Sequence, residues 1–156
     1  MTAFEDCEVR EAPLPQGAVR YRELGIGEPI VLVHGLLTNS LLWAGVASAL
    51  AREFRVIAPD WPLGSHERPL HPGTDLSPPG LARVIADFLV ALELEDVMLV
   101  GNDTGGALCQ LVAVHHPERV ARLVLTPCDA LGMVDGHELA QRAAGVVADE
   151  DRKSVV

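Results

Sequence analysis

The sequence predicts an α/β protein in which crossover helices connect a mostly parallel sheet. Short apolar runs alternate along the chain with segments of helical periodicity, an order that is typical of parallel sheets. The chain has 156 residues, of which 49% are hydrophobic and 22% are charged. This length and this composition favour one globular domain over a disordered chain.

Five strands are expected, and four of them are continuous apolar runs. The first strand begins at Ala18, ends at about Glu23 and precedes a turn at residues 25–27. Pro13 and Pro15 interrupt the segment before it. An apolar run rich in β-branched residues is typical of a strand that is covered on both faces. The four runs are Pro29–Val33, Arg55–Ala58, Val97–Val100 and Leu123–Leu125.

Three helices are expected between the strands. From Leu81 to Leu92, apolar residues recur every three or four positions, which places them on one helical face. Ser77 suits the N-cap of this helix, and prolines follow it in the first turn. The other two helices are predicted at Leu41–Leu50 and Ala107–His115. In such sheets, functional residues gather at the carboxyl ends of the strands.

The charge of the chain disfavours several classes of partner. Lysine and arginine number 12 against 22 aspartates and glutamates, a net charge of −10 that repels nucleic-acid phosphates and anionic lipids. No apolar run approaches the length of a membrane span. Cys7, Cys109 and Cys128 have no metal-site or disulfide spacing. We therefore expect a cytoplasmic protein that acts on a small molecule without a metal or cofactor; its oligomeric state is left open.

Three informative segments follow the predicted parallel strands. His34-Gly35 comes directly after one strand, and a Pro-Asp loop at residues 59–66 comes after the next. The third segment, residues 101–106, reads Gly-Asn-Asp-Thr-Gly-Gly between a strand and a helix. It has the form small-x-nucleophile-x-small, with Asp103 in the central place. All three segments are expected at one edge of the sheet.

The third segment predicts a sharp turn with Asp103 at its apex, where the backbone is often strained. Gly101 and Gly105 are expected to be small because a side chain there would collide with a neighbouring strand or helix, and Gly106 completes the run. The helix that follows directs its amides and its positive dipole end at the carboxylate. This environment favours an ionised Asp103 that is ready to attack an electrophile.

In their order along the chain, these segments resemble the N-terminal half of the α/β-hydrolase fold, over residues 18–130. We call the sharp turn at residues 101–106 the elbow. An aspartate at its apex resembles the haloalkane dehalogenase and epoxide hydrolase branch. The resemblance implies that Asp103 attacks a haloalkane, epoxide or ester and forms a covalent ester, which a histidine-activated water hydrolyses. It also implies an oxyanion hole made by the backbone amides of Leu36 and Thr104.

Two departures from the pattern leave the leaving group open. Both families commonly place tryptophan after the nucleophile, where this chain has Thr104. Leu36 and Leu37 follow the His-Gly pair in place of the asparagine of dehalogenases or the aromatic-proline pair of epoxide hydrolases. The donors that would grip a halide are therefore not evident in this sequence.

The resemblance also implies residues that this sequence does not supply. None of its six histidines can take the place of the family's catalytic histidine, which follows the last strand, and Asp129 is a candidate for the triad acid. We expect residues 1–130 to be the N-terminal part of a hydrolase core, inactive alone. Residues 131–156 read as an atypical tail, and the last six can be back-translated as GAT-CGG-AAG-AGC-GTC-GTG, a sequencing-adapter string. We hypothesise a truncation artefact.

Other interpretations remain open at this stage. Asp103 could N-cap a helix that starts near Gly105, or the fold could hold a ligand without turnover. The glycine-rich turn also suggests a nucleotide binder, although it lacks both the Gly-x-Gly-x-x-Gly pattern and the Lys-Ser/Thr of a P-loop. His34 is expected to be a structural turn residue, and Asp60 to bond loop amides.

Overall fold

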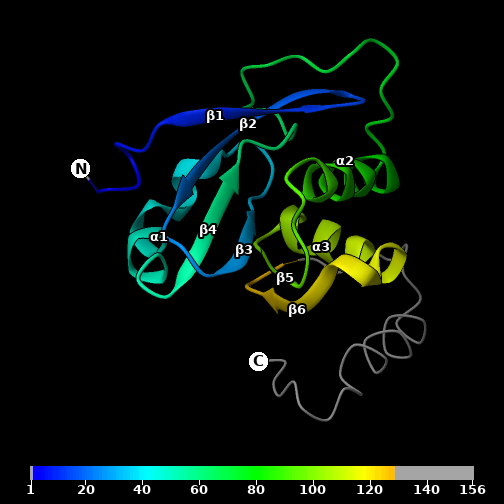
Figure 1. Cartoon of the computed structure of the whole chain (residues 1–156). Helices are drawn as coiled ribbons and strands as arrows, with labels where there is room; N and C mark the ends of the chain where they lie inside the picture. The colour runs from blue at the N-terminus through cyan, green and yellow to red at the C-terminus, as the bar shows by residue number, and fades with distance from the viewer. Residues whose placement is uncertain (1, 129–156) are drawn as a thin grey trace.

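The apolar runs lie side by side as parallel strands in a computed structural model, which describes residues 2–128 (Figure 1). The six strands are β1 (Val9–Leu14), β2 (Gly17–Leu24), β3 (Glu28–Val33), β4 (Phe54–Pro59), β5 (Val97–Gly101) and β6 (Val120–Leu125). The helices are α1 (Ala44–Leu50), α2 (Pro78–Ala91) and α3 (Thr104–His115), with 3-10 turns at Ser40–Trp43 and Pro117–Arg119.

The six strands form one sheet in the order β1-β2-β4-β3-β5-β6. Strands β4, β3, β5 and β6 are parallel, whereas β2 pairs antiparallel with both β1 and β4. In β3, Ile30 lies opposite Val56 of β4 and Met98 of β5, which fixes the register at the centre of the sheet. The predicted α/β class and the mostly parallel sheet are confirmed.

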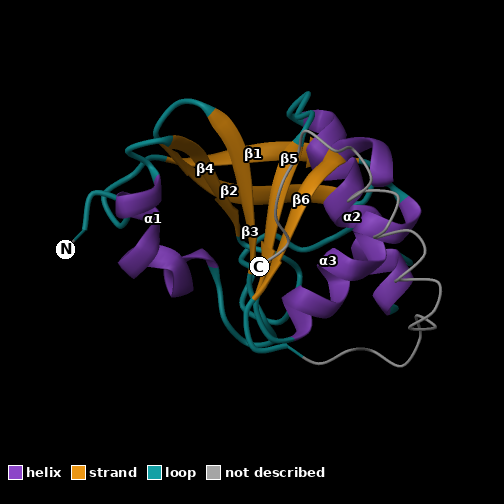
Figure 2. Ribbon diagram, turned by 90° about the horizontal axis from the view of Figure 1, so that it is seen from below, coloured by secondary structure: helices purple, strands orange, loops and turns teal. Residues whose placement is uncertain are grey.

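Alternate residues of β3 face two separate cores. Ile30 and Leu32 pack in a cluster with Ala47 of α1, while Val31 and Val33 pack in a cluster with residues of α2 and α3. Figure 2 shows the same division, with α1 on one side of the sheet and α2 and α3 on the other. The continuous apolar run at β3 is therefore explained by burial on both faces.

The capping prediction for α2 is confirmed. The hydroxyl of Ser77 accepts a hydrogen bond from the backbone N–H of Gly80 at 3.3 Å, and prolines occupy the first helical positions. Because the first N–H groups of a helix lack intrahelical partners, this bond defines where the helix begins.

Strand β1 was not predicted from the sequence. Its Pro13 is compatible with a strand because β1 lies at the edge of the sheet, where a missing N–H need not break a ladder. Helix α3 begins at Thr104, three residues before the predicted Ala107, because its glycines pack against the sheet.

Two predictions fall outside the described residues, namely the candidate acid Asp129 and the atypical tail at 131–156. Within residues 2–128, no helix is both long enough and apolar enough to cross a membrane.

Candidate active site

Asp103 occupies the junction between β5 and α3 with an unusual backbone conformation. Its φ of 54° and ψ of −132° lie where non-glycine residues are rarely found. Such a conformation costs on the order of 1–3 kcal/mol and persists only where surrounding contacts hold it. The strained apex that the sequence predicts is present.

Close packing of glycine backbones explains how so sharp a turn fits between strand and helix. A Cβ atom built on Gly101 would lie 2.5 Å from the Cα of Gly106. A Cβ atom on Gly105 would lie 2.3 Å from the carbonyl oxygen of Val33 in β3. Both collisions were predicted from the sequence, and both involve backbone atoms that cannot rotate away.

The side chain of Asp103 is exposed and lies against the turn after β3. A Cβ atom on Gly35 would come within 2.2 Å of Oδ2 of Asp103, so only glycine leaves room for the carboxylate at this place. The carboxylate makes no capping bond to the amides of α3. Its side-chain hydrogen bond comes from the hydroxyl of Thr104 at 3.4 Å, and it joins no ion pair among the described residues. The N-cap interpretation of Asp103 is therefore not supported.

Leu36 follows Gly35, whose Cβ position lies against the carboxylate of Asp103, and Thr104 follows Asp103 directly. The neighbouring N–H of Leu37 donates to the carbonyl of Leu63 at 2.9 Å. Within residues 2–128, by contrast, the N–H groups of Leu36 and Thr104 have no acceptor in the turn and loop bonds. Two unpaired donors beside a carboxylate suit an anionic oxygen on a bound molecule.

His34 is a structural residue of the turn. Its ring is fully buried, and its Nε2 accepts a hydrogen bond from the backbone N–H of Trp61 at 2.9 Å. Its Nδ1 therefore carries the proton and donates to the carbonyl of Gly35 at 2.9 Å. With both nitrogens engaged, His34 orients the His-Gly turn that packs on Asp103 and is unsuited to carrying protons.

Burial gives His34 a predictable effect on stability. Desolvation lowers its pKa below the ordinary value of 6.5, against an opposing contribution from the Gly35 carbonyl. As the pH falls below about 6.5, the unfolded chain takes up a proton before the folded chain does, so the free energy of unfolding declines. Urea titrations at pH 8 and pH 5 should show this loss. His34→Asn should have a lower free energy of unfolding than the wild type at pH 8, but this free energy should fall less between pH 8 and pH 5. His115→Gln, at an exposed site, should show the same fall between the two pH values as the wild type.

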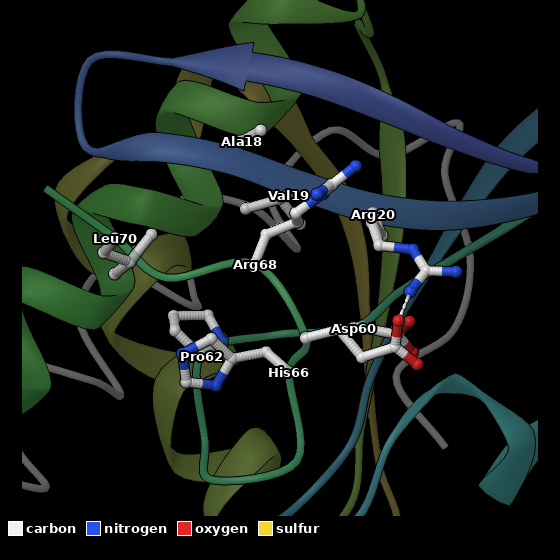
Figure 3. Close-up of a pocket in the computed structure, with 9 residues that line it drawn as sticks. Ala18, Val19, Arg20, Asp60, Pro62, His66, Arg68 and Leu70 are labelled. Carbon is white, nitrogen blue, oxygen red and sulfur yellow. Dashed lines mark hydrogen bonds and ion pairs between the residues drawn. The ribbon is translucent and has the colours of Figure 1, made fainter.

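The Pro-Asp loop and strand β2 line a small pocket (Figure 3). One carboxylate oxygen of Asp60 accepts the N–H of Ser40 at 2.9 Å, so Asp60 bonds a loop amide as predicted. Arg20 pairs with Glu67 across the pocket. The lining residues are Ala18, Val19, Arg20, Asp60, Pro62, His66, Glu67, Arg68 and Leu70. Asp103 is not among them, so the pocket is separate from the elbow.

Thr126 and Pro127, which follow β6, were not predicted to contact the residues around Asp103. The carbonyl of Pro127 accepts the N–H of Asp103 at 3.0 Å, and the hydroxyl of Thr126 accepts a side-chain N–H of Asn102 at 2.9 Å. The available signal was the position of Thr126 directly after a parallel strand, at the same edge of the sheet as Asp103.

The chain is similar to a family of known proteins. A family model described as alpha/beta hydrolase fold matches residues 28–142. Haloalkane dehalogenase 2 of Mycobacterium tuberculosis is 37% identical over 124 residues, which cover 76% of this chain and 43% of that protein. The 2-hydroxy-6-oxo-2,4-heptadienoate hydrolase of Pseudomonas putida is 44% identical over 109 residues, covering 66% and 38% respectively.

A solved structure shows the same arrangement of elements. Epoxide hydrolase CorEH superposes with a TM-score of 0.72 at 27% sequence identity, covering 86% of this chain and 48% of that protein. The chain therefore spans less than half the length of each of these three proteins.

Proposed function

The chain belongs to the α/β-hydrolase fold family, and on that premise we propose that Asp103 is the nucleophile of a hydrolase that acts on small organic electrophiles. The observation that carries the proposal is the position of this carboxylate. It is exposed, joins no ion pair within residues 2–128, and stands on a strained backbone at the amino end of α3.

The proposed reaction has two covalent steps. An oxygen of Asp103 attacks a saturated carbon, a carbon–oxygen bond forms, and the bond from that carbon to a halide or epoxide oxygen breaks. The product is an alkyl ester on Asp103. Water then attacks the carboxyl carbon of the ester; one of its protons goes to the leaving alkoxide, which departs as an alcohol, and the other goes to solvent. This step restores the carboxylate with one oxygen from water.

The N–H groups of Leu36 and Thr104, which have no acceptor within residues 2–128, suit the second step. Attack of water places negative charge on the former carboxyl oxygen, and two backbone donors can stabilise it without moving. Removal of one such donor typically costs about 3 kcal/mol of transition-state stabilisation. The names of the relatives support this substrate class, since a haloalkane and an epoxide both offer an electrophilic saturated carbon.

The experiment is alkylation of the 156-residue chain with a primary alkyl bromide, followed by intact-mass measurement. Free cysteines and histidines also react with an alkyl bromide, so the ester is counted as the mass that hydroxylamine removes. Among residues 2–128, no histidine side chain is hydrogen-bonded to Asp103, and we expect the ester on Asp103 to form faster than esters on other carboxylates and to accumulate. Asp103→Asn should remove most of this fast-forming ester because the amide is a far weaker nucleophile.

Asp96→Asn is the matched control for this substitution. Asp96 also has a left-handed backbone, with φ of 52°, but it lies in the turn before β5. This variant should keep the adduct. If Asp103→Asn reacted as fast as the wild type, the covalent proposal would be wrong, and ligand binding without turnover would be the better interpretation.

A further inference from the structure

A network of hydrogen bonds joins the two residues before Asp103 to Thr126, which follows β6. The hydroxyl of Thr126 donates to the carbonyl of Gly101 at 3.1 Å and accepts from Nδ2 of Asn102 at 2.9 Å. The backbone N–H of Thr126 donates to the same carbonyl of Gly101 at 3.0 Å. Residues 101 and 102 are thus bonded through one hydroxyl to the segment that follows β6.

The backbone of the elbow is also held from two sides. The N–H of Asn102 donates to the carbonyl of Val33 at 3.1 Å, and the N–H of Asp103 donates to the carbonyl of Pro127 at 3.0 Å. These bonds attach the elbow to β3 on one side and to the end of β6 on the other. Both strands neighbour β5 in the sheet.

The strained backbone of Asp103 requires neighbouring contacts that hold it, and this network supplies them. A φ of 54° at a non-glycine residue reverts to a relaxed conformation unless neighbouring contacts prevent it. The residue before the apex is Asn102, and the residue whose carbonyl receives the apex N–H follows Thr126 directly. The side-chain bond between Asn102 and Thr126 therefore joins the two segments that fix the apex.

We propose that Asn102 and Thr126 are positioning residues for Asp103. Their shared hydrogen bond holds the loop after β6 against the elbow and so maintains the bond from the N–H of Asp103 to the carbonyl of Pro127. The proposal rests on the proposed function only in treating Asp103 as the reacting group. A threonine or serine is required at 126 because a hydroxyl donates and accepts at once.

Hydrogen exchange of the Asp103 amide, measured by NMR, tests this proposal without any substrate. Thr126→Val keeps the shape of the side chain and removes both hydroxyl bonds, so exchange at Asp103 should accelerate about tenfold. Thr126→Ser restores the hydroxyl and should restore the wild-type rate. Thr74→Val is the matched control, because it removes a hydroxyl bond to the carbonyl of His71 far from the elbow and should leave Asp103 unchanged.

Asn102→Ala removes the donor of the hydrogen bond to Thr126 and tests the proposal if Thr126→Val does not fold. It should accelerate exchange at Asp103 about fivefold, and adding it to Thr126→Val should have little further effect, since both remove one shared bond. Amides of α2 should keep their rates. An unchanged rate at Asp103 in Asn102→Ala, or equal acceleration in α2, would overturn the proposal. Because the exchange rates are measured without an alkyl bromide, a failed alkylation test would contradict the proposed function and leave this positioning proposal unaffected.

Discussion

Alanine at position 105 should destabilise the fold by about 3 kcal/mol, a large share of the stability of a small domain. The new Cβ atom would lie 2.3 Å from the carbonyl oxygen of Val33 and 2.5 Å from that of His34. Both are backbone atoms at the end of the central strand β3, so neither can move without disturbing the sheet. Urea denaturation of Gly105→Ala measures this loss as a lower midpoint.

Gly45→Ala provides the matched control for this substitution. Gly45 lies in α1, and nothing lies within 4 Å of the position its Cβ would take. Alanine there should raise stability by roughly 0.5–1 kcal/mol, because glycine is the poorer helix former. Equal stabilities of Gly105→Ala and the wild type would show that α3 does not pack against β3 as described.

Alanine at position 35 should act on reactivity more than on stability. Its Cβ would lie 2.2 Å from Oδ2 of Asp103, so the carboxylate must move by an ångström or more. A displacement of that size can reduce the rate of an oriented reaction about 100-fold. We expect Gly35→Ala to alkylate about 100-fold more slowly than the wild type.

The same alkyl bromide and intact-mass measurement serve for this variant. Gly45→Ala should react at the wild-type rate, because its position is remote from any close contact. A Gly35→Ala chain that reacts as fast as the wild type would mean that the turn after β3 does not place the carboxylate.

Local sequence patterns were sufficient to predict the centre of the sheet. Burial on both faces requires an apolar residue at every position of β3, and that requirement is visible in Pro29–Val33. The N-cap at Ser77 was predicted for a similar reason, since capping depends on a residue and its nearest neighbours. Strand β1 lacks such a pattern because most of its side chains are exposed or half-exposed and one residue is proline.

The candidate site was predicted only in part, because its contacts join distant segments. The glycines around Asp103 indicated a tight turn from spacing alone. The packing of Gly35 on the carboxylate and the bond between Asn102 and Thr126 depend on which strands are neighbours in the sheet. A sequence pattern does not show which strands are neighbours, so these contacts could be identified only from the structure.

The most direct test of the claim that the fold makes Asp103 reactive is peptide mapping after limited alkylation, in buffer and in urea. Cysteines and histidines also react with the alkyl bromide, so only the label that hydroxylamine removes from esters is counted, and 22 aspartates and glutamates compete for it. In the folded chain, we expect more than about half of the label on Asp103, because the elbow orients this one carboxylate. In urea, the label should spread over the acidic residues. The same spread in both conditions would contradict a nucleophilic Asp103.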